Sequence, residues 1–504
     1  MDPITLTLIA GALVIIYLYL RNGKCFNLPP GPKGYPLIGN LLDYKRDGRP
    51  PWLHFHNLTK TYGDIFNFKL GFGFLENIIV LNSGESINEA FLQPKSPFDA
   101  RPKTWSLEKF TDGGRDIMMG DPDDPVWMLM RKLTSGGLRN FLSGARMDHK
   151  CHSSLEKGVT LLKQHLGEPF DTKPVLNLMI FNVICDMLFN AQFEFDDAEF
   201  EDLYTSLDAV DKIFGNVILE DVITPLQWLP FKTPTTRKAI ELDTHVLDIL
   251  GKYVTDHQEK YDPDDISDLI DYIIRAKKKL EIENPNLAAK LTERHMVQIV
   301  NDGFGAGTST SSQTLYWMIF FMAKYPEIQT RVQSELDDTI GHNLPSMSDK
   351  PNLVYCEAVM LESMRFCPYG ALALHATSTD AKLFDFDVPK GSQVWANIYA
   401  SHHDEKIWPD PDEFKPERFI QKDGKIMPRP RSWLTFGAGR RSCIGEPVGR
   451  HQVFVFFTSL MQKFRFRFPD GCDFKDKPIS PSRFESNGFV CMSKPYDIII
   501  DERA

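Results

Sequence analysis

The sequence has no closely spaced pair of cysteines. Its eight cysteines are scattered over 504 residues, with neither a C-x-x-C pair nor the spacing of a disulfide framework. This argues against a structural zinc site and against a secreted disulfide scaffold. The chain also lacks a glycine-rich fingerprint for flavin or nicotinamide, an internal repeat and a low-complexity tract. A reducing compartment is therefore expected for the main body.

Basic residues are outnumbered by acidic residues. The 57 Lys and Arg residues face 68 Asp and Glu residues, and the formal net charge is −11. Nucleic-acid binding requires a basic surface that neutralises phosphates, so we expect no nucleic-acid partner. A hydrophobic fraction of 42% is that of an ordinary globular protein. The length by itself allows one large core or two domains.

The N-terminus contains a long uncharged stretch. Residues from Ile4 to Leu20 carry no charge, and Arg21 and Lys24 follow directly. This length is at the lower limit for crossing a bilayer, and the flanking charges predict a cytosolic body. A cleaved signal peptide is the alternative, but its positive charges would precede the apolar run. We expect residues 1–24 to form a single-pass N-terminal transmembrane helix, an anchor in the endoplasmic reticulum membrane.

A proline-rich linker is expected over residues 25–40, because Pro29-Pro30-Gly31-Pro32 cannot continue a helix. Strand-like stretches follow between Asn67 and Val80, and helical periodicity dominates from about residue 84. One helical pattern runs from Thr292 to about Lys324 and ends before a proline. We therefore predict a mainly α fold with small β-sheets, in a catalytic domain over residues 41–504.

That long helix contains glycines at 303, 305 and 307. Each glycine costs roughly 1 kcal/mol relative to alanine inside a helix. Three in succession suggest that a bulky group needs space at this point.

The most informative motif is Phe436-Gly-Ala-Gly439-Arg-Arg441-Ser-Cys443-Ile-Gly445. It places one cysteine at the start of a helical pattern, where backbone N–H groups point at the sulfur. The positive end of the helix is expected to lower the thiol pKa and to favour the thiolate, which is a metal ligand. A buried inert cysteine is the alternative, but five fixed identities in this short stretch argue against it.

These residues resemble the haem-binding loop of the cytochrome P-450 family, and the similarity extends from the anchor to the C-terminus. Asn301 to Thr310 and Trp395 to Phe419 resemble the steroid 17α-hydroxylase and aryl-hydrocarbon hydroxylase groups. The resemblance implies the cytochrome P-450 fold of the microsomal type and a haem b cofactor (iron protoporphyrin IX). Cys443 would be the proximal iron ligand.

The resemblance also assigns roles around the haem. Trp127 and Arg131, four residues apart on a helix, would meet a haem propionate, and His375 would donate to another, although a surface histidine is the alternative. Phe436 and Arg441 belong to the same loop as the ligand. A structural network that braces the haem side would comprise Glu362, Arg365 and Arg418.

The oxygen pocket is expected on the long helix. The resemblance puts Ala306 and Gly307 beside the pocket and gives Thr310 the hydroxyl that relays protons. An ordinary helix hydroxyl bonded to a backbone carbonyl is the alternative for Thr310. The family usually has an acid before that threonine, and this chain has Ser309. Because serine does not ionise near neutral pH, protons would come from water, from Asp302 or from the substrate.

Electrons would come from a separate protein, since the chain has no flavin or nicotinamide motif. The resemblance implies NADPH-cytochrome P-450 reductase, with cytochrome b5 as a further partner. Between Lys422 and Arg450 cations outnumber acids, which would suit an acidic partner docking over the thiolate side. Neutralisation of the propionates is the other explanation for this local charge.

We therefore expect a haem-thiolate monooxygenase that inserts one oxygen atom from O₂ into a hydrophobic small molecule, steroid-like or polycyclic. A haem-thiolate isomerase or dehydratase acting on an oxygenated lipid, and a non-enzymatic haem sensor, are the alternatives. The expected pocket walls, by position in the resembling family, are Trp105 to Asp121, Thr205 to Phe231, Asp302 to Thr310, Ala371 to Leu374 and Asn487 to Phe489.

Overall fold

The structure is a computed structural model of the whole chain. It describes residues 26–35, 38–45, 49–71, 77–142, 145–214, 218–222, 224–228, 232–472, 483–485 and 488–503, together with the single positions 2, 5, 11, 12, 474 and 479. The predicted membrane anchor, residues 1–24, lies outside these residues apart from positions 2, 5, 11 and 12. Within the described part of the chain, no helix has both the length and the apolar character that crossing a membrane requires.

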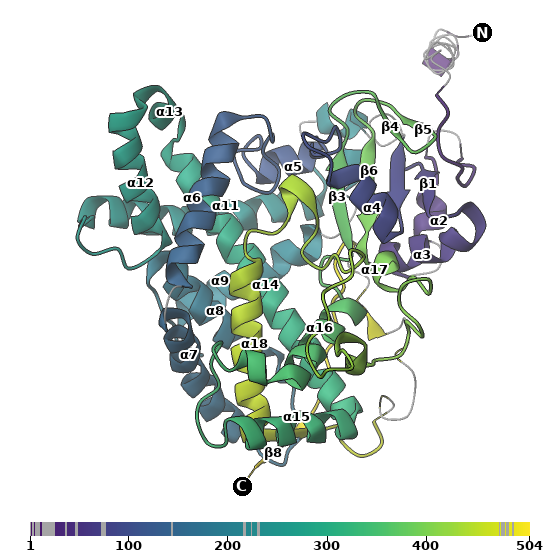
Figure 1. Ribbon diagram of the computed structural model, residues 1–504. Coiled ribbons are helices and arrows are strands. Elements are labelled where there is room, and N and C mark those ends of the chain that lie inside the picture. Colours follow the sequence, from purple (N-terminus) through teal and green to yellow (C-terminus); the bar gives the residue numbers. More distant parts are fainter. Residues whose placement is uncertain are drawn as a thin grey trace.

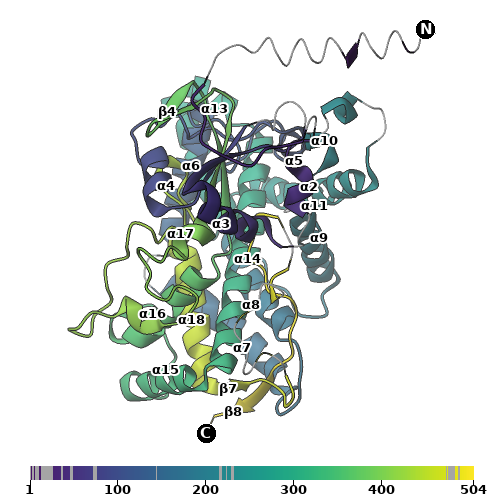
Figure 2. The same ribbon diagram turned by 90° about the vertical axis from the view of Figure 1, so that its right-hand side faces the viewer.

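Helices make up most of the molecule and surround two long central helices, α14 and α18, which run side by side (Figures 1 and 2). The predicted mainly α fold with small sheets is confirmed. The helices are α2 (Leu41–Lys45), α3 (Pro51–Tyr62), α4 (Gly84–Phe91), α5 (Trp105–Phe110), α6 (Pro125–Phe141), α7 (Arg146–Lys163), α8 (Lys173–Phe189), α9 (Ala198–Phe214), α10 (Leu219–Val222), α11 (Pro234–Lys260), α12 (Leu269–Glu283), α13 (Pro285–Lys290), α14 (Glu293–Lys324), α15 (Pro326–Thr339), α16 (Val354–Phe366), α17 (Ile398–His402) and α18 (Glu446–Lys463).

Most of the strands gather on one side of the helices, and the last two form a separate pair near the C-terminus (Figure 1). A four-stranded sheet has the order β1-β2-β6-β3, in which β2 and β6 are parallel and the other pairs antiparallel. Every residue of β2 and β6 is buried, as expected for strands covered on both faces. The strands are β1 (Ile65–Phe68), β2 (Ile78–Leu81), β3 (Leu372–Ala376), β4 (Ala381–Leu383), β5 (Phe386–Val388), β6 (Gln393–Asn397), β7 (Phe464–Arg467) and β8 (Ile499–Glu502).

Helix α14 forms over the predicted residues. Thr292 is its N-cap, and the backbone N–H of Thr292 donates to Nδ1 of His295. Pro326 begins the next helix and cannot continue this one. With 32 residues, α14 is about 48 Å long, so it crosses the whole molecule.

The glycines of α14 allow close packing against α8, a mostly apolar helix that is buried from Val175 onward. A Cβ on Gly303 would lie 2.9 Å from the side chain of Leu188, and one on Gly307 would lie 2.7 Å from that of Ile184. Cβ atoms in proteins essentially never come this close to another heavy atom. Neither position therefore accommodates alanine unless the neighbouring side chain shifts. The bulky groups beside these two glycines are therefore aliphatic side chains of a neighbouring helix.

The proline-rich segment lies against the sheet. The backbone N–H of Asn67 in β1 donates to the carbonyl of Pro30 at 2.8 Å, and a Cβ on Gly31 would collide with the carbonyl of Asn67. Farther toward the N-terminus, Asn27 donates to Asp387 in β5. The described part of segment 25–40 is thus held by backbone contacts to the body.

Candidate active site

The site is built around the loop that precedes α18. The backbone N–H of Cys443 donates to the carbonyl of Phe436 at 2.9 Å, which closes the loop. Gly437 and Gly439 have φ angles of 72° and 68°, a region that disfavours other residues. In addition, a Cβ on Gly439 would overlap the carbonyl oxygen of Phe91. The glycine spacing seen in the sequence is therefore required by the backbone path.

The sulfur of Cys443 receives the backbone N–H groups of Gly445 and Glu446 at the start of α18. This part of the prediction is confirmed. The predicted low pKa was wrong: burial raises the pKa of the Cys443 thiol, and the charge of Glu446 also opposes ionisation. Two N–H groups and the charge of Arg131 favour the thiolate but do not outweigh desolvation. Cys443 is nevertheless an exposed residue, so part of it is accessible from outside the chain although its sulfur is largely enclosed.

The loop is attached to the fully buried Arg365 through His402. The guanidinium of Arg365 donates to the His402 carbonyl at 2.7 Å, and His402 Nδ1 donates to the Arg365 carbonyl at 3.1 Å. His402 Nε2 then accepts the N–H of Leu434 at 2.8 Å. Burial lowers the pKa of His402 to about 3, so the ring stays neutral and can accept this bond.

Arg365 belongs to the predicted three-residue network. It donates to both carboxylate oxygens of Glu362, at 2.7 and 2.9 Å, and Arg418 donates to the same carboxylate at 3.0 Å. Glu362 and Arg365 are 0% exposed, which distinguishes this network from a surface ion pair.

Two of the predicted cationic side chains share one aromatic ring. The guanidinium of Arg441 lies 4.4 Å from the ring centre of Trp127, and that of Arg131 lies 5.2 Å away. Arg131 also donates to the carbonyl of Ser442, next to the cysteine. The indole N–H of Trp127 donates to the carbonyl of Ile117, so it is already satisfied by the protein.

A third cation, Arg101, was missed from the sequence because no motif spacing links it to the loop. It is held by the carbonyls of Met118 and Leu374, from two different segments. Burial lowers the pKa of Arg101 to about 10, and burial with the charges of Arg101 and Arg131 lowers that of Arg441 to about 9. Only tertiary structure brings these like charges together.

His375 lies next to this cluster in β3. Its ring stacks on Phe91 at 3.9 Å, and Nδ1 faces the carbonyl of Phe98 at 2.9 Å. It is 4% exposed, which excludes the surface alternative. Burial, together with the charges of Arg101 and Arg441, holds the pKa of His375 well below its usual range.

On α14, the candidate oxygen-pocket residues occupy the middle of the helix. Ala306 is exposed although it lies at the centre of a long helix, so open space borders it. The hydroxyl of Thr310 donates to the Ala306 carbonyl at 2.7 Å, which is the alternative foreseen for an ordinary helix hydroxyl. Ser309 is half-buried, and its carbonyl accepts the hydroxyl of Ser312. Gly307 turns its side-chain position toward α8.

The contact between α14 and α18 puts this region near the cysteine loop. Gln452 of α18 donates to the hydroxyl of Ser311 at 2.6 Å, and a Cβ on Gly449 would lie 3.7 Å from that same oxygen. Ser311 directly follows Thr310, and Gly449 lies less than two turns after Cys443. The segment of α14 that carries Ala306 and Thr310 therefore lies near the start of α18, which the cysteine loop precedes.

Comparison with known proteins decides the family. Residues 29–500 match the family model described as Cytochrome P450. The chain belongs to the cytochrome P450 family. It is a cytochrome P450 monooxygenase, a haem enzyme, and the alternative of a non-enzymatic haem sensor is set aside.

Individual P450 relatives agree with this assignment. The chain is 34% identical over 456 residues to the steroid 17-alpha-hydroxylase/17,20 lyase of Squalus acanthias, with 89% of this chain and 88% of the relative covered. It is 32% identical over 453 residues to cytochrome P450 1A1 of Platichthys flesus, with 87% of this chain and 85% of the relative covered. A steroid 17-alpha-hydroxylase/17,20 lyase of Rana dybowskii is 31% identical over 481 residues, with 94% and 89% covered.

The P450 family implies haem b, and the residues present fit such a group. The buried Nη1 of Arg441 has no hydrogen-bond partner within the described protein, and the neighbouring guanidiniums of Arg101 and Arg131 lower the pKa of Arg441. Such an excess of buried positive charge is stabilised by an anionic ligand. Haem has two carboxylates and an iron that takes a thiolate ligand, which matches this donor set.

Asp302 connects α14 of this P450 to the segment before α6. Its carboxylate accepts the backbone N–H of Ile117 at 2.7 Å. Burial raises the pKa of Asp302 well above its usual range, and the charge of Asp116 raises it further. Burial likewise raises the pKa of Asp116 to about 6. Both carboxyl groups therefore bind a proton more readily than an exposed aspartate does.

Replacing Asp302 with alanine is expected to destabilise the fold by about 1–3 kcal/mol, because the Ile117 N–H would lose its acceptor in a buried place. Chemical denaturation of the wild type and the Asp302→Ala variant measures this difference. An Asp302→Asn variant keeps an acceptor oxygen and should lose less. Equal losses in both variants would contradict a role for the Ile117 hydrogen bond.

Proposed function

We propose that this P450 is a haem-thiolate monooxygenase that inserts one oxygen atom of O₂ into a hydrophobic small molecule, with Cys443 as the iron ligand. The observation that carries the proposal is the placement of Cys443. Its sulfur receives two backbone N–H groups, and the residue is exposed rather than part of the core. When haem is bound, thiolate ligation supplies the electron density that favours O–O cleavage.

The cationic cluster would bind the haem propionates. Arg441 offers an unused Nη1, Arg131 is anchored beside the ligand loop, and Arg101 joins them from another segment. His375 would add a ring nitrogen, and Trp127 would support the two guanidiniums that lie over it. Phe436 would act through its carbonyl, which holds the N–H of Cys443.

Residues of α14 would serve the oxygen side. Ala306 would border the pocket with its exposed methyl group, and the backbone of Gly307 would lie next to it. Thr310 would relay protons once its hydroxyl leaves the Ala306 carbonyl, which it now occupies. Ser309 would pass protons between waters, because its hydroxyl both donates and accepts but does not ionise.

The substrate we propose is a rigid apolar compound, steroid-like or polycyclic. Two relatives are named steroid 17-alpha-hydroxylases, which supports the steroid class. The proposed pocket wall includes α5, the middle of α14 and the residues at the start of β3. Phe231 and Asn487, at the ends of two predicted wall segments, lie outside the described residues.

Electrons would come from NADPH through cytochrome P-450 reductase, with cytochrome b5 as a second donor. Four cations of the predicted basic segment are exposed: Lys422, Lys425, Arg429 and Arg431. Arg429 also pairs with Glu446 and Lys425 with Asp423, so Lys422 and Arg431 are the cations we propose to face an acidic partner. Arg441 is instead buried toward Gly120, and Arg450 pairs with Glu357. The docking surface we propose is therefore smaller than the sequence alone indicated.

We further propose residues 1–24 as a membrane anchor in the endoplasmic reticulum, residues 25–40 as the linker and residues 41–504 as a cytosolic catalytic domain. The uncharged run from Ile4 to Leu20 and the cations Arg21 and Lys24 that follow it support the anchor. Deleting residues 1–24 should move the protein from the membrane fraction to the supernatant after high-salt washing.

The test of the proposed function uses the purified full chain. The reduced protein under carbon monoxide should have the Soret band of a thiolate-ligated haem. Added reductase and NADPH should then convert members of a steroid and polycyclic panel into products that contain one oxygen atom from ¹⁸O₂. A normal thiolate spectrum without ¹⁸O in any product would contradict the monooxygenase reaction on these substrate classes.

A haem-thiolate isomerase or dehydratase is the second candidate. It is favoured by Ser309 and by the occupied hydroxyl of Thr310, because such a reaction needs no proton delivery to oxygen. It predicts conversion of an oxygenated lipid without O₂ and NADPH. Turnover that requires both would exclude it.

Replacing Ser309 with aspartate is expected to improve coupling, because an ionisable group would stand beside Thr310. A general acid–base group accelerates proton transfer by about 10²–10⁴-fold. Even a small fraction of this acceleration should at least halve the amount of peroxide released per NADPH consumed. Peroxide and NADPH are measured with the same substrate. Unchanged peroxide release would show that protons already reach the site by another path.

A further inference from the structure

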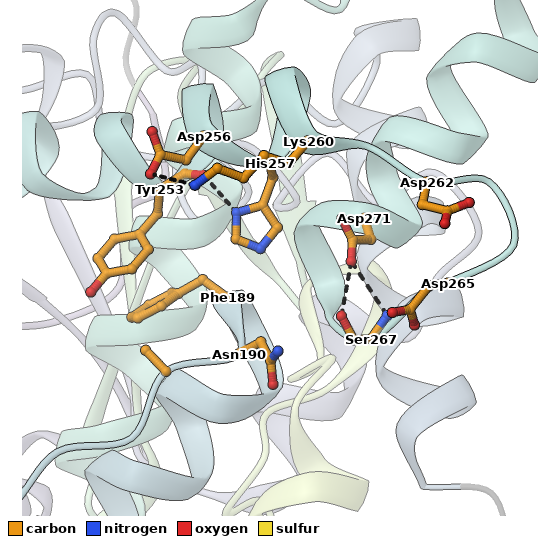
Figure 3. Close-up of a pocket in the computed structure, with 11 residues that line it drawn as sticks. Phe189, Asn190, Tyr253, Asp256, His257, Lys260, Asp262, Asp265, Ser267 and Asp271 are labelled. Atoms are coloured by element: carbon orange, nitrogen blue, oxygen red, sulfur yellow. Dashed lines mark hydrogen bonds and ion pairs between the residues drawn. The ribbon is translucent and has the colours of Figure 1, made fainter.

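The hollow between the end of α11 and the start of α12 is polar, but several of its side chains interact with one another (Figure 3). Lys260 forms an ion pair with Asp256, and the hydroxyl of Ser267 donates to Asp271. A polar group that lacks such partners lies on α14 instead. It is the side-chain amide of Gln313, which no step of the proposed oxygenation uses.

Gln313 is buried without a hydrogen-bond partner for its side chain. The residue is 3% exposed, and within the described part of the chain neither Oε1 nor Nε2 has a partner. The hydroxyls of Ser312 and Thr314, its neighbours in sequence, donate to backbone carbonyls of α14 instead. An amide has two donors and an acceptor oxygen, and leaving them unpaired in a buried place is costly. An internal water molecule is the usual partner of such a group.

The position of Gln313 connects it to the proposed oxygen side. It lies three residues after Thr310 and four before Trp317, so the three side chains project from one face of α14. Exposure falls along this face, from the exposed Ala306 through the half-buried Thr310 to the buried Gln313. Farther along, the indole N–H of Trp317 donates to the carbonyl of Cys491. Gln313 therefore lies where the accessible part of this face ends.

The hydroxyl of Thr310 can accept a hydrogen bond from the side of Gln313. Its own proton is used in the bond to the Ala306 carbonyl, but its oxygen keeps lone pairs that accept. Side chains three residues apart on a helix have Cβ atoms about 5–6 Å apart, a separation that one water molecule bridges. The amide of Gln313 and the hydroxyl of Thr310 are therefore suited to hold one water between them.

We propose that Gln313 is a positioning residue, whose buried amide holds a water molecule that donates a hydrogen bond to the hydroxyl of Thr310. This inference rests on the proposed oxygenation, in which Thr310 relays protons. The water gives a proton to Oγ1 of Thr310 as Thr310 passes its own proton on, and it regains one from further water. Because neither the amide nor Ser309 ionises near neutral pH, Gln313 acts by holding this water and not as an acid.

Gln313→Met in the haem-loaded full chain tests the proposal, because methionine has a similar length but lacks the amide. The assay contains reductase, NADPH and the compound of the steroid and polycyclic panel that is turned over fastest. The variant should release at least about twice as much peroxide per NADPH as the wild type, because a positioned proton donor accelerates transfer by about 10²–10⁴-fold and part of this effect is lost. The KM for the compound should stay the same, since the water serves proton transfer and not substrate binding.

Gln298→Met is the matched control. Gln298 is also a glutamine of α14, it is 1% exposed, and its Nε2 has no partner among the described residues either. It lies about four turns before Gln313 and away from Thr310, so its replacement should leave peroxide release unchanged. Gln313→Glu is the conservative variant. Burial keeps this carboxyl group protonated, so it still donates and accepts, and its peroxide release should stay close to that of the wild type.

A crystal structure of the substrate-free protein, at a resolution that shows ordered water, is a second test that does not depend on turnover. One water should lie within hydrogen-bonding distance of both the Gln313 amide and Oγ1 of Thr310, and it should be absent from Gln313→Met. A wild-type structure without this water would overturn the proposal. Equal peroxide release by the wild type and Gln313→Met, or an equal rise in Gln298→Met, would do the same. If no panel compound is oxygenated, the proposed function fails, while the position of the water still decides this inference.

Discussion

Replacing Cys443 with serine is expected to remove the thiolate-type Soret band of the reduced, carbon monoxide-bound protein and to abolish oxygenation. The hydroxyl is smaller, harder and far less acidic, so it does not replace a thiolate on iron. Product formation should fall by more than about 100-fold, because even residues that only support a metal ligand cost 10–100-fold. Absorption spectroscopy and product analysis measure the two effects.

The fold should survive this change, because the backbone N–H of Cys443, not its sulfur, closes the loop on Phe436. Circular dichroism of the variant should therefore match the wild type. Cys472→Ser is a suitable control, since Cys472 is also a free thiol that is only partly buried. A Cys443→Ser variant that keeps the thiolate-type band would assign the iron ligand to another residue.

Replacing Glu362 with alanine is expected to lower the free energy of unfolding by about 3–5 kcal/mol, the cost of breaking a buried ion pair from one side. Arg365 is 0% exposed and would lose the carboxylate that accepts two of its hydrogen bonds. Arg418 and the N–H of Lys415 would lose the same acceptor. Denaturant unfolding measures the loss.

The same substitution should also loosen the haem. Arg365 holds His402, and His402 accepts the N–H of Leu434 at the start of the cysteine loop. Haem transfer to an acceptor protein should therefore be faster in Glu362→Ala. Lys279→Ala is the control, because its pair with Glu283 is exposed and worth less than about 1 kcal/mol. Similar losses in both variants would refute the bracing role.

Much of this molecule was predictable from local pattern. Helix α14 was predicted to within a residue because an N-cap and a proline mark its ends. The cysteine loop was predicted because glycines with positive φ and a following helix are local features. Arg101 could not be predicted, since its two carbonyl partners, Met118 and Leu374, come from distant segments.

The pKa of the Cys443 thiol could not be predicted from local pattern. The helix start and two N–H groups favour its ionisation, as the sequence indicated. Burial acts in the opposite direction and is the larger effect in the protein chain, so the pKa is raised. Desolvation depends on every atom around the sulfur, and no short motif contains that information.

The sequence by itself therefore determined the family, the loop that carries Cys443, the long helix and the cofactor that the family implies. Each of these depends on residues close together in the chain or on motif identity. Tertiary structure alone decided other neighbours, such as Arg101 with Arg441 and Asp116 with Asp302. Such pairs depend on packing between helices and strands, and burial then determines how strongly their charges act on one another.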